Sequence, residues 1–170
     1  IKGFKDIDGD ETSINTISLI PNGNMLVGGS GGALYEYQKQ PDGSYKLSEL
    51  IEGFKDKDGD ETHINAISPL PNGNMLIGGG AGALYEYQKQ PDGSYKLSER
   101  IAGFKNKNGH ETSIDTISPL PNGNMLIGGW LGVLYEYQKQ SDGSYKLSQR
   151  IAGFKNKYGN ETSIDTISPL

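Results

Sequence analysis

The chain has 170 residues, a formal net charge of −5 and no cysteine. Its length suits one domain of ordinary size. The sequence offers no basic patch that could neutralise a run of phosphates, which argues against nucleic acid as a partner. The absence of cysteine excludes disulfides and thiolate metal or redox chemistry. No apolar run approaches the roughly 18 residues of a membrane span, so we expect no membrane association. None of these features indicates a cellular compartment.

Three consecutive stretches, 1–50, 51–100 and 101–150, are copies of one unit, and residues 151–170 begin a fourth copy. A repeat of this period predicts units that stack on one another within a single domain, 1–170. Glycine accounts for 25 of the 170 residues and hydrophobic residues for 34%. This composition is lean for a helical core and typical of short strands broken by many turns.

The first half of each copy predicts a hairpin. In the first copy we expect an apolar strand from Ile14 to Ile20 and a turn at 21–24, where Pro-Asn-Gly-Asn supplies the turn dihedrals. The second strand, Met25 to Gly28, is apolar on both faces, as expected of a strand between two packed layers.

The second half predicts another hairpin. A third strand from Ala33 to Gln38 has two alternating faces. The sequence Gln-Pro-Asp-Gly-Ser at 40–44 is a strong turn signal, and a fourth strand follows from Tyr45 to Ile51. A polar loop then leads to the first strand of the next copy.

A four-stranded antiparallel meander repeated at about this interval is typical of a β-propeller blade. Each blade has two apolar faces, which it can cover only by stacking against its neighbours. We predict an all-β fold with three complete four-stranded antiparallel blades and the first strand of a fourth, from Ile164 to Leu170. A parallel β-solenoid is the alternative, but the two hairpin turns in each copy argue against it.

The glycine pair and the aromatic residues after it resemble a kelch repeat. In that family a glycine pair precedes a tyrosine and then a tryptophan, and here Gly28-Gly29 precedes Tyr35 and Tyr37. The departure is that Tyr45 stands where a kelch repeat has its tryptophan. The order of polar loop, apolar strand, glycine pair and Leu-Tyr is also similar to a WD40 repeat, without the Trp-Asp pair. Either resemblance implies a propeller and carries over no catalytic residue.

The number of blades is unusual, because propellers have about 4 to 8 blades. Three blades do not close a ring comfortably. We therefore expect the chain either to form a homo-oligomer or to be part of a longer propeller.

Alternate connections of a meander emerge at the same end of the sheet. The loop before each first strand and the loop after each glycine pair should therefore share one rim, which varies among the copies. The two tight turns should share the other rim, where Pro-Asn-Gly-Asn is constant. Binding residues sit preferentially on loops carried by a rigid scaffold, so we interpret the variable rim as a binding face. Drift in tolerant loops is the alternative.

The candidate ligand-binding residues on this rim are Trp130, Leu131, His110, Asn108 and Tyr158. Trp130 is the only tryptophan, and an aromatic residue beside an apolar one on a rim is a reasonable anchor for a protein or a sugar ring. The alternative for Trp130 is packing against the next blade. For His110 it is an ordinary surface role.

The acidic loop at 56–61, Asp-Lys-Asp-Gly-Asp-Glu, invites a calcium interpretation, because carboxylates supply hard oxygen ligands. However, the glycine is fourth rather than sixth, and the third and fourth copies lose these aspartates. We expect Asx-turns there, no metal site and no cofactor.

No nucleophile–base set, phosphate-binding loop or distinctive carboxylate pair is present. The sequence therefore favours a non-enzymatic module that binds a protein or a glycan through one loop rim. The alternative is a structural or assembly element, including an engineered, ancestral-like or truncated repeat protein, that closes a propeller by homo-oligomerisation. A third hypothesis is an enzyme that uses the central channel of a propeller.

Overall fold

The computed structural model describes residues 3–151 and 153–168 and contains three four-stranded antiparallel sheets, each with its strands in chain order. The first sheet contains β1 (Ile14–Leu19), β2 (Met25–Gly29), β3 (Leu34–Lys39) and β4 (Tyr45–Leu50). The second contains β5 (Ile64–Pro69), β6 (Met75–Gly79), β7 (Leu84–Lys89) and β8 (Tyr95–Leu97). The third contains β9 (Ile114–Pro119), β10 (Met125–Gly129), β11 (Leu134–Lys139) and β12 (Tyr145–Leu147). The predicted all-β fold is confirmed.

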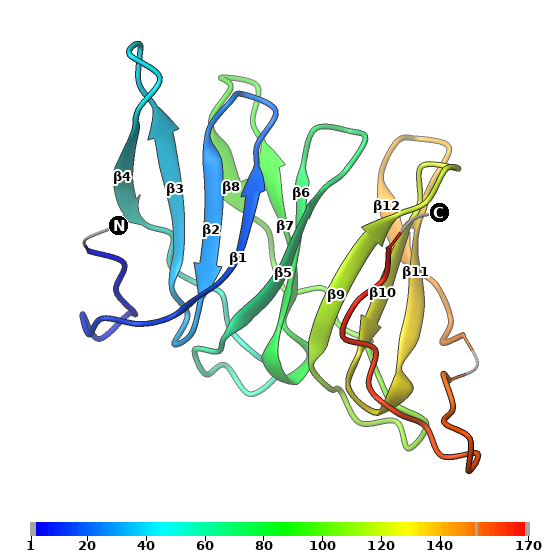
Figure 1. The fold of residues 1–170 in the computed structure, drawn as a ribbon. Coiled ribbons are helices and arrows are strands. Elements are labelled where there is room, and N and C mark those ends of the chain that lie inside the picture. Colours follow the sequence, from blue (N-terminus) through cyan, green and yellow to red (C-terminus); the bar gives the residue numbers. More distant parts are fainter. Residues whose placement is uncertain (1–2, 152, 169–170) are drawn as a thin grey trace.

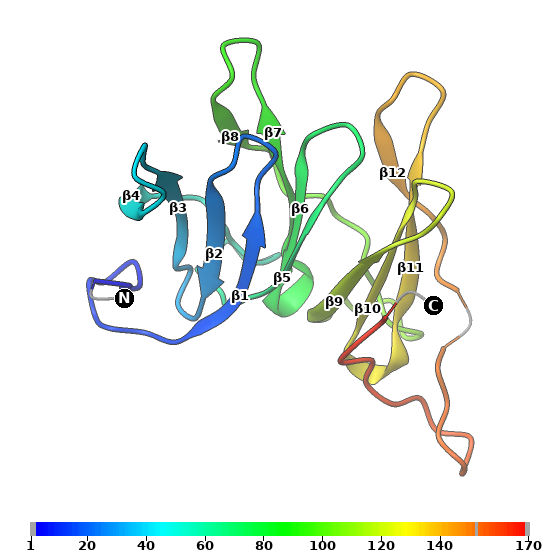
Figure 2. The ribbon, with the colours of Figure 1, turned by 45° about the horizontal axis from the view of Figure 1, so that its top comes forward.

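The three sheets stand in a row, with the two termini at opposite ends of that row (Figure 1). Successive first strands lie beside one another, β1 against β5 and β5 against β9. Figure 2 shows β4, β8 and β12 lying away from this line of first strands. This is the arrangement of propeller blades around an axis. No helix within the described residues is long and apolar enough to cross a membrane.

The structure differs from the predicted strands at two places. β8 and β12 end earlier than β4. At these ends the N–H groups of Glu86 and Glu136 donate to the hydroxyls of Ser98 (3.0 Å) and Ser148 (3.0 Å), and not to a strand carbonyl. The strand expected from Ile164 to Leu170 is not formed over 164–168, and 169–170 lie outside the described residues. Among the described residues, no strand lies beside 164–168 to pair with it.

The glycine pair that ends each second strand sets the spacing between neighbouring blades. A Cβ on Gly28 would overlap the Ile64 side chain of the next blade, closer than real Cβ atoms approach. The second glycine, Gly29, lies against the Phe4 ring and the Ser13 carbonyl of its own blade. The pair thus allows close packing on both sides of β2, and the same relation recurs in the second blade.

The hydrophobic core lies between blades and repeats with them. Between the first and second blades, Leu26 and Leu34 pack with Phe54, Met75 and Tyr85, all buried. The corresponding residues form the cluster between the second and third blades. Two apolar sheet faces are therefore covered at each junction. Burial of this apolar surface is expected to be the main favourable contribution to the free energy of folding.

Candidate functional site

We use the name loop rim for two sets of loops. They are the loops before the first strands (residues 3–13, 51–63, 98–113 and 153–163) and the short loops after the glycine pairs (30–33, 80–83 and 130–133). Both sets lie at the lower end of the sheets in Figure 1. Backbone hydrogen bonds join them, since the Ile7 N–H donates to the Gly31 carbonyl (3.3 Å) and the Lys57 N–H to the Ala81 carbonyl (3.4 Å). The predicted sharing of one rim is confirmed.

Trp130 and Leu131 begin the short loop after the third glycine pair. The Trp130 N–H donates to the Ser113 carbonyl (3.1 Å), which fixes the backbone of the loop. The Trp130 side chain nevertheless remains 56% exposed, and Leu131 is 36% exposed. Within the described residues, Trp130 therefore does not pack against a next blade.

Leu131 adopts a left-handed backbone conformation, with φ 59° and ψ 32°. The first copy has Gly31 at this position, also with φ 59°. A side chain in this region costs about 1–2 kcal/mol relative to the right-handed conformation. A strained residue on an exposed loop is a reason to suspect function at that place.

A small cavity of about 120 Å³ lies beside this loop. It is lined by Asn106, Lys107, Asn108, Leu131, Asn160 and Glu161. The structure therefore brings two of the five candidates, Leu131 and Asn108, to one place. Amides donate and accept hydrogen bonds and a carboxylate accepts them, so the cavity offers polar partners next to an apolar edge.

The other candidates lie apart from this cavity. His110 lines a shallow depression of about 580 Å³, together with Lys57, Arg100, Lys105, Gly109 and Glu111. Tyr158 is 75% exposed, and the Lys157 ammonium lies 4.9 Å from the centroid of its ring. The candidates thus share the loop rim without forming a single cluster.

The polar loops are held by Asx-turns, as predicted. Asp6 Oδ1 accepts hydrogen bonds from the N–H groups of Asp8 (3.1 Å) and Asp10 (3.0 Å). Asn106 Oδ1 accepts the equivalent two bonds in the third copy. Because aspartate and asparagine both supply this oxygen, the loop keeps its shape when the charge is lost. Within residues 3–151 and 153–168, no group of three or more His, Cys, Asp or Glu side chains could hold a metal ion.

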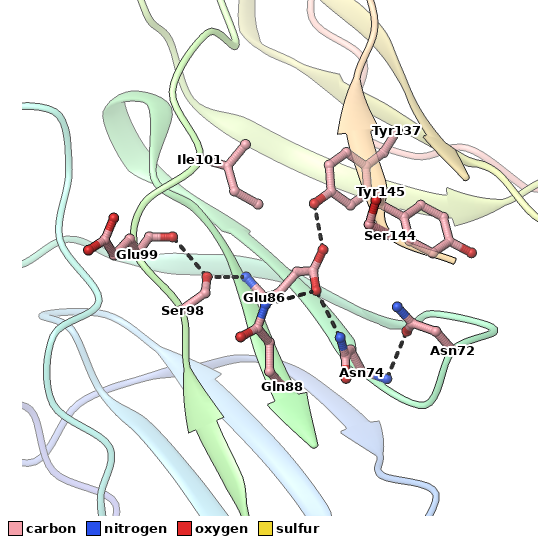
Figure 3. A pocket seen from close by; sticks show the side chains of 10 residues that line it. All are labelled: Asn72, Asn74, Glu86, Gln88, Ser98, Glu99, Ile101, Tyr137, Ser144 and Tyr145. Carbon is pink, nitrogen blue, oxygen red and sulfur yellow. Dashed lines mark hydrogen bonds between the residues drawn. The ribbon is translucent and has the colours of Figure 1, made fainter. Parts of the chain in front are cut away.

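A second kind of site, which the sequence did not reveal, lies between neighbouring blades. Figure 3 shows the groove between the second and third blades, which has a volume of about 470 Å³. It is lined by Asn72, Asn74, Glu86, Gln88, Ser98, Glu99, Ile101, Tyr137, Ser144 and Tyr145. Both blades contribute side chains, so the groove exists only where two blades meet.

The buried Glu86 carboxylate lies at the centre of this groove. Its Oε2 accepts a hydrogen bond from Asn74 Nδ2 (2.9 Å), and its Oε1 accepts one from the Tyr137 hydroxyl of the next blade (2.6 Å). Burial raises the pKa of Tyr137, and the hydrogen bond to Glu86 raises it further, so the tyrosine donates as a neutral phenol. The pair forms a polar link between the two blades (Figure 3).

The groove recurs between the first and second blades with a volume of about 630 Å³. There the Tyr87 hydroxyl donates to Glu36 Oε2 (2.9 Å). The signal in the sequence was the recurrence of a glutamate and a tyrosine in each third strand, at Glu36, Glu86 and Glu136 and their neighbours. That recurrence did not show that the tyrosine of one blade meets the glutamate of the blade before it.

The repeated four-stranded sheets, with their first strands side by side, identify the chain as a set of β-propeller blades. No protein-family model matches the chain. No curated protein matches it either. The fold is similar to the X-ray structure of a "putative gluconolactonase", with a TM-score of 0.52 and 16% sequence identity. The match covers 94% of this chain and 59% of that chain, and at this identity it shows the propeller fold alone.

Proposed function

We propose that this chain is a non-enzymatic binding module that recognises a ligand through the loop rim of its third blade. The observation that carries the proposal is the exposed Trp130, one residue from a cavity lined by three asparagines and a glutamate. An aromatic face beside amide and carboxylate groups suits a ligand with apolar ring faces and many hydroxyls. A glycan has both features, and the small cavity favours a sugar over a protein surface.

The backbone strain at Leu131 supports the same location. The first copy has glycine in this conformation and the second has the small Ala81, whereas the third copy places an exposed leucine there. Leu131 and Trp130 are both exposed to solvent, so neither side chain packs in the hydrophobic core. A role in contacting a ligand accounts for side chains that the fold itself does not need.

Fluorescence provides the test, because Trp130 is the only tryptophan and reports on the rim directly. Titration with a panel of neutral mono- and disaccharides should give a saturable change in emission for at least one sugar. Calorimetry with that sugar should show loss of binding in Trp130→Ala. The matched control is Leu19→Ala, which removes another exposed side chain on β1, away from the rim. A flat response to every sugar, or full binding by Trp130→Ala, would contradict the proposal.

An assembly element is the second candidate function. The observation in its favour is apolar surface at both ends of the row of blades. On the first blade Ile14, Ile17 and Leu19 are exposed, and beyond the third blade Phe154 is 60% exposed. Surface of this kind commonly marks an interaction site.

A further inference from the structure

Each blade presents two different faces to its neighbours. We use the name forward face for the side with Leu126, Leu134 and Glu136 in the third blade. The rear face is the side with Ile14 and Tyr37 in the first blade. A forward face meets a rear face at both junctions within the chain. One forward face and one rear face remain at the ends of the row, and they are the two halves of this same interface.

The forward face of the third blade is incompletely covered. A cavity of about 330 Å³ lies against it, lined by Leu126, Leu134, Phe154 and residues 163–167. The equivalent leucines of the second blade, Leu76 and Leu84, are fully buried by side chains of β10 and β11. The cavity thus lies where a following blade would place its second and third strands.

The rear face of the first blade is exposed along β1, whereas Phe4, Val27, Tyr35 and Tyr37 on the same face are buried within the chain. Ile14 is 39% exposed, whereas its counterparts Ile64 and Ile114 are fully buried. The Tyr37 hydroxyl is buried and has no hydrogen-bond partner among the described residues. The counterparts of Tyr37 in the other blades, Tyr87 and Tyr137, each donate to a glutamate of the preceding blade. Conversely, the described residues place no tyrosine against Glu136.

Residues 153–168 occupy part of the forward face in the manner of a following blade. Ile164 lies on Gly128 as Ile64 lies on Gly28. Among the described residues, three hydrogen bonds and an ion pair hold it: the N–H groups of Phe154 and Ile164 donate to the carbonyls of Gly132 (3.3 Å) and Gly129 (3.1 Å). The Ile167 N–H donates to Thr116 Oγ1 (3.3 Å), and the Arg150 guanidinium pairs with the Glu161 carboxylate. This segment covers the position of a loop and a first strand, and it leaves the positions of the other three strands open.

We propose that a second copy of this chain docks the rear face of its first blade on this forward face and displaces residues 153–168. Docking uncovers the buried Tyr37 hydroxyl of the second copy, which then donates to Glu136 and completes a third inter-blade groove. Its Ile14 takes the place of Ile164 against Gly128. This inference rests on the second candidate function, the assembly element.

A second copy is favoured over another occupant because the apolar contacts and the tyrosine–glutamate bond that it would make already exist at the two internal junctions. The docked rear face repeats residues that fill the two internal junctions, with the same glycine, leucine and glutamate opposite them. Identical units that stack by one interface can also stack across chains by that interface. Two copies with three sheets each give six blades, within the usual range of about 4 to 8 for a closed ring.

Sedimentation equilibrium of the whole chain tests the proposal without any ligand, so its outcome is independent of the glycan test. We expect a mass about twice the 18.4 kDa of one chain. Ile14→Lys should give a monomer, whereas Ile164→Lys should tighten association, because it weakens the segment that competes for the forward face. Ile7→Lys is the matched control, since Ile7 is 38% exposed but lies on the loop rim, and it should leave the mass unchanged.

Three outcomes would overturn the proposal. The first is a monomeric parent chain at ~100 μM, a concentration at which a dimer of micromolar affinity would be fully formed. The second is a dimer that persists in Ile14→Lys. The third is a series of larger open assemblies. Thermal melting followed by circular dichroism shows whether Ile14→Lys is folded. If it is not, Tyr37→Phe replaces it, because that change removes only the one hydroxyl that the second copy would use.

Discussion

The Tyr137 hydroxyl donates a 2.6 Å hydrogen bond to Glu86 Oε1 across a separation of 51 residues. This bond joins the third strand of one blade to the third strand of the blade before it. A hydrogen bond to a charged group contributes about 1.5–3 kcal/mol, more than a neutral one. The link is also directional, because each blade accepts on its forward face and donates from its rear face. It therefore fixes the order in which blades stack, and apolar packing alone would fix that order less strictly.

The glycine pairs should be intolerant of even one added methyl group. Gly78→Ala places a Cβ against Ile114 of the next blade, within a fully packed junction. We expect a loss of about 1–3 kcal/mol in the free energy of unfolding, as is typical of overpacking. Gly128→Ala, measured below the concentration of dimerisation, is the matched control, because residues 153–168 and not a complete blade then lie across from it. Chemical denaturation should show the smaller loss for Gly128→Ala, and equal losses would refute this account of the glycine pair.

Leu131→Gly should stabilise the fold and weaken ligand binding. Relief of the left-handed strain is worth about 1–2 kcal/mol. The greater freedom of glycine in the unfolded chain offsets about 0.5–1 kcal/mol of this. Ala81→Gly is the control, since Ala81 has φ 43° on the same kind of loop in the second blade. Both variants should melt at a higher temperature, but only Leu131→Gly should lose saccharide affinity. Unchanged affinity in Leu131→Gly would remove this residue from the proposed site.

Asp115 is a weak point of the third blade. Asn15 and Asn65, at the same position, donate their amides to the carbonyls of Ile64 (3.1 Å) and Ile114 (3.0 Å) in the next blade. A carboxylate cannot donate this bond. We expect Asp115→Asn to stabilise the chain by about 0.5–1.5 kcal/mol at neutral pH, through one added hydrogen bond. Asn65→Asp should have the opposite effect, and equilibrium unfolding of the two variants tests the pair.

The effect of Asp115 should also depend on pH. Desolvation raises the pKa of Asp115 above its ordinary value of 3.8, and the nearby Asp165 raises it further. The folded state therefore binds this proton more tightly than the unfolded state, so the parent chain loses stability as pH rises through the folded pKa. The advantage of Asp115→Asn should shrink as pH falls toward 3.8. An advantage that grows on acidification would show that the carboxylate is not the cause.

Much of the fold could be predicted from the sequence repeat and from residue types within each copy. The hairpins around Pro21 and Pro41 and the alternation along the third strand follow from local residue types, and the structure has both. The inter-blade groove could not be predicted in the same way, because it depends on Tyr137 reaching Glu86 in a different copy. The loop rim was predictable from topology, but the separation of His110 from Leu131 depends on loop conformations that the residue pattern does not determine.

The most direct test of the shared blade interface compares two tyrosines. Below the concentration of dimerisation, Tyr87→Phe should lower the free energy of unfolding by about 1.5–3 kcal/mol, because Tyr87 has an internal partner in Glu36. Tyr37→Phe should not lower it, because the buried Tyr37 hydroxyl has no partner among the described residues. In sedimentation, Tyr37→Phe should instead weaken dimerisation about tenfold or more, the factor that corresponds to ~1.4 kcal/mol. An unchanged dissociation constant, or equal destabilisation by the two substitutions, would contradict the account.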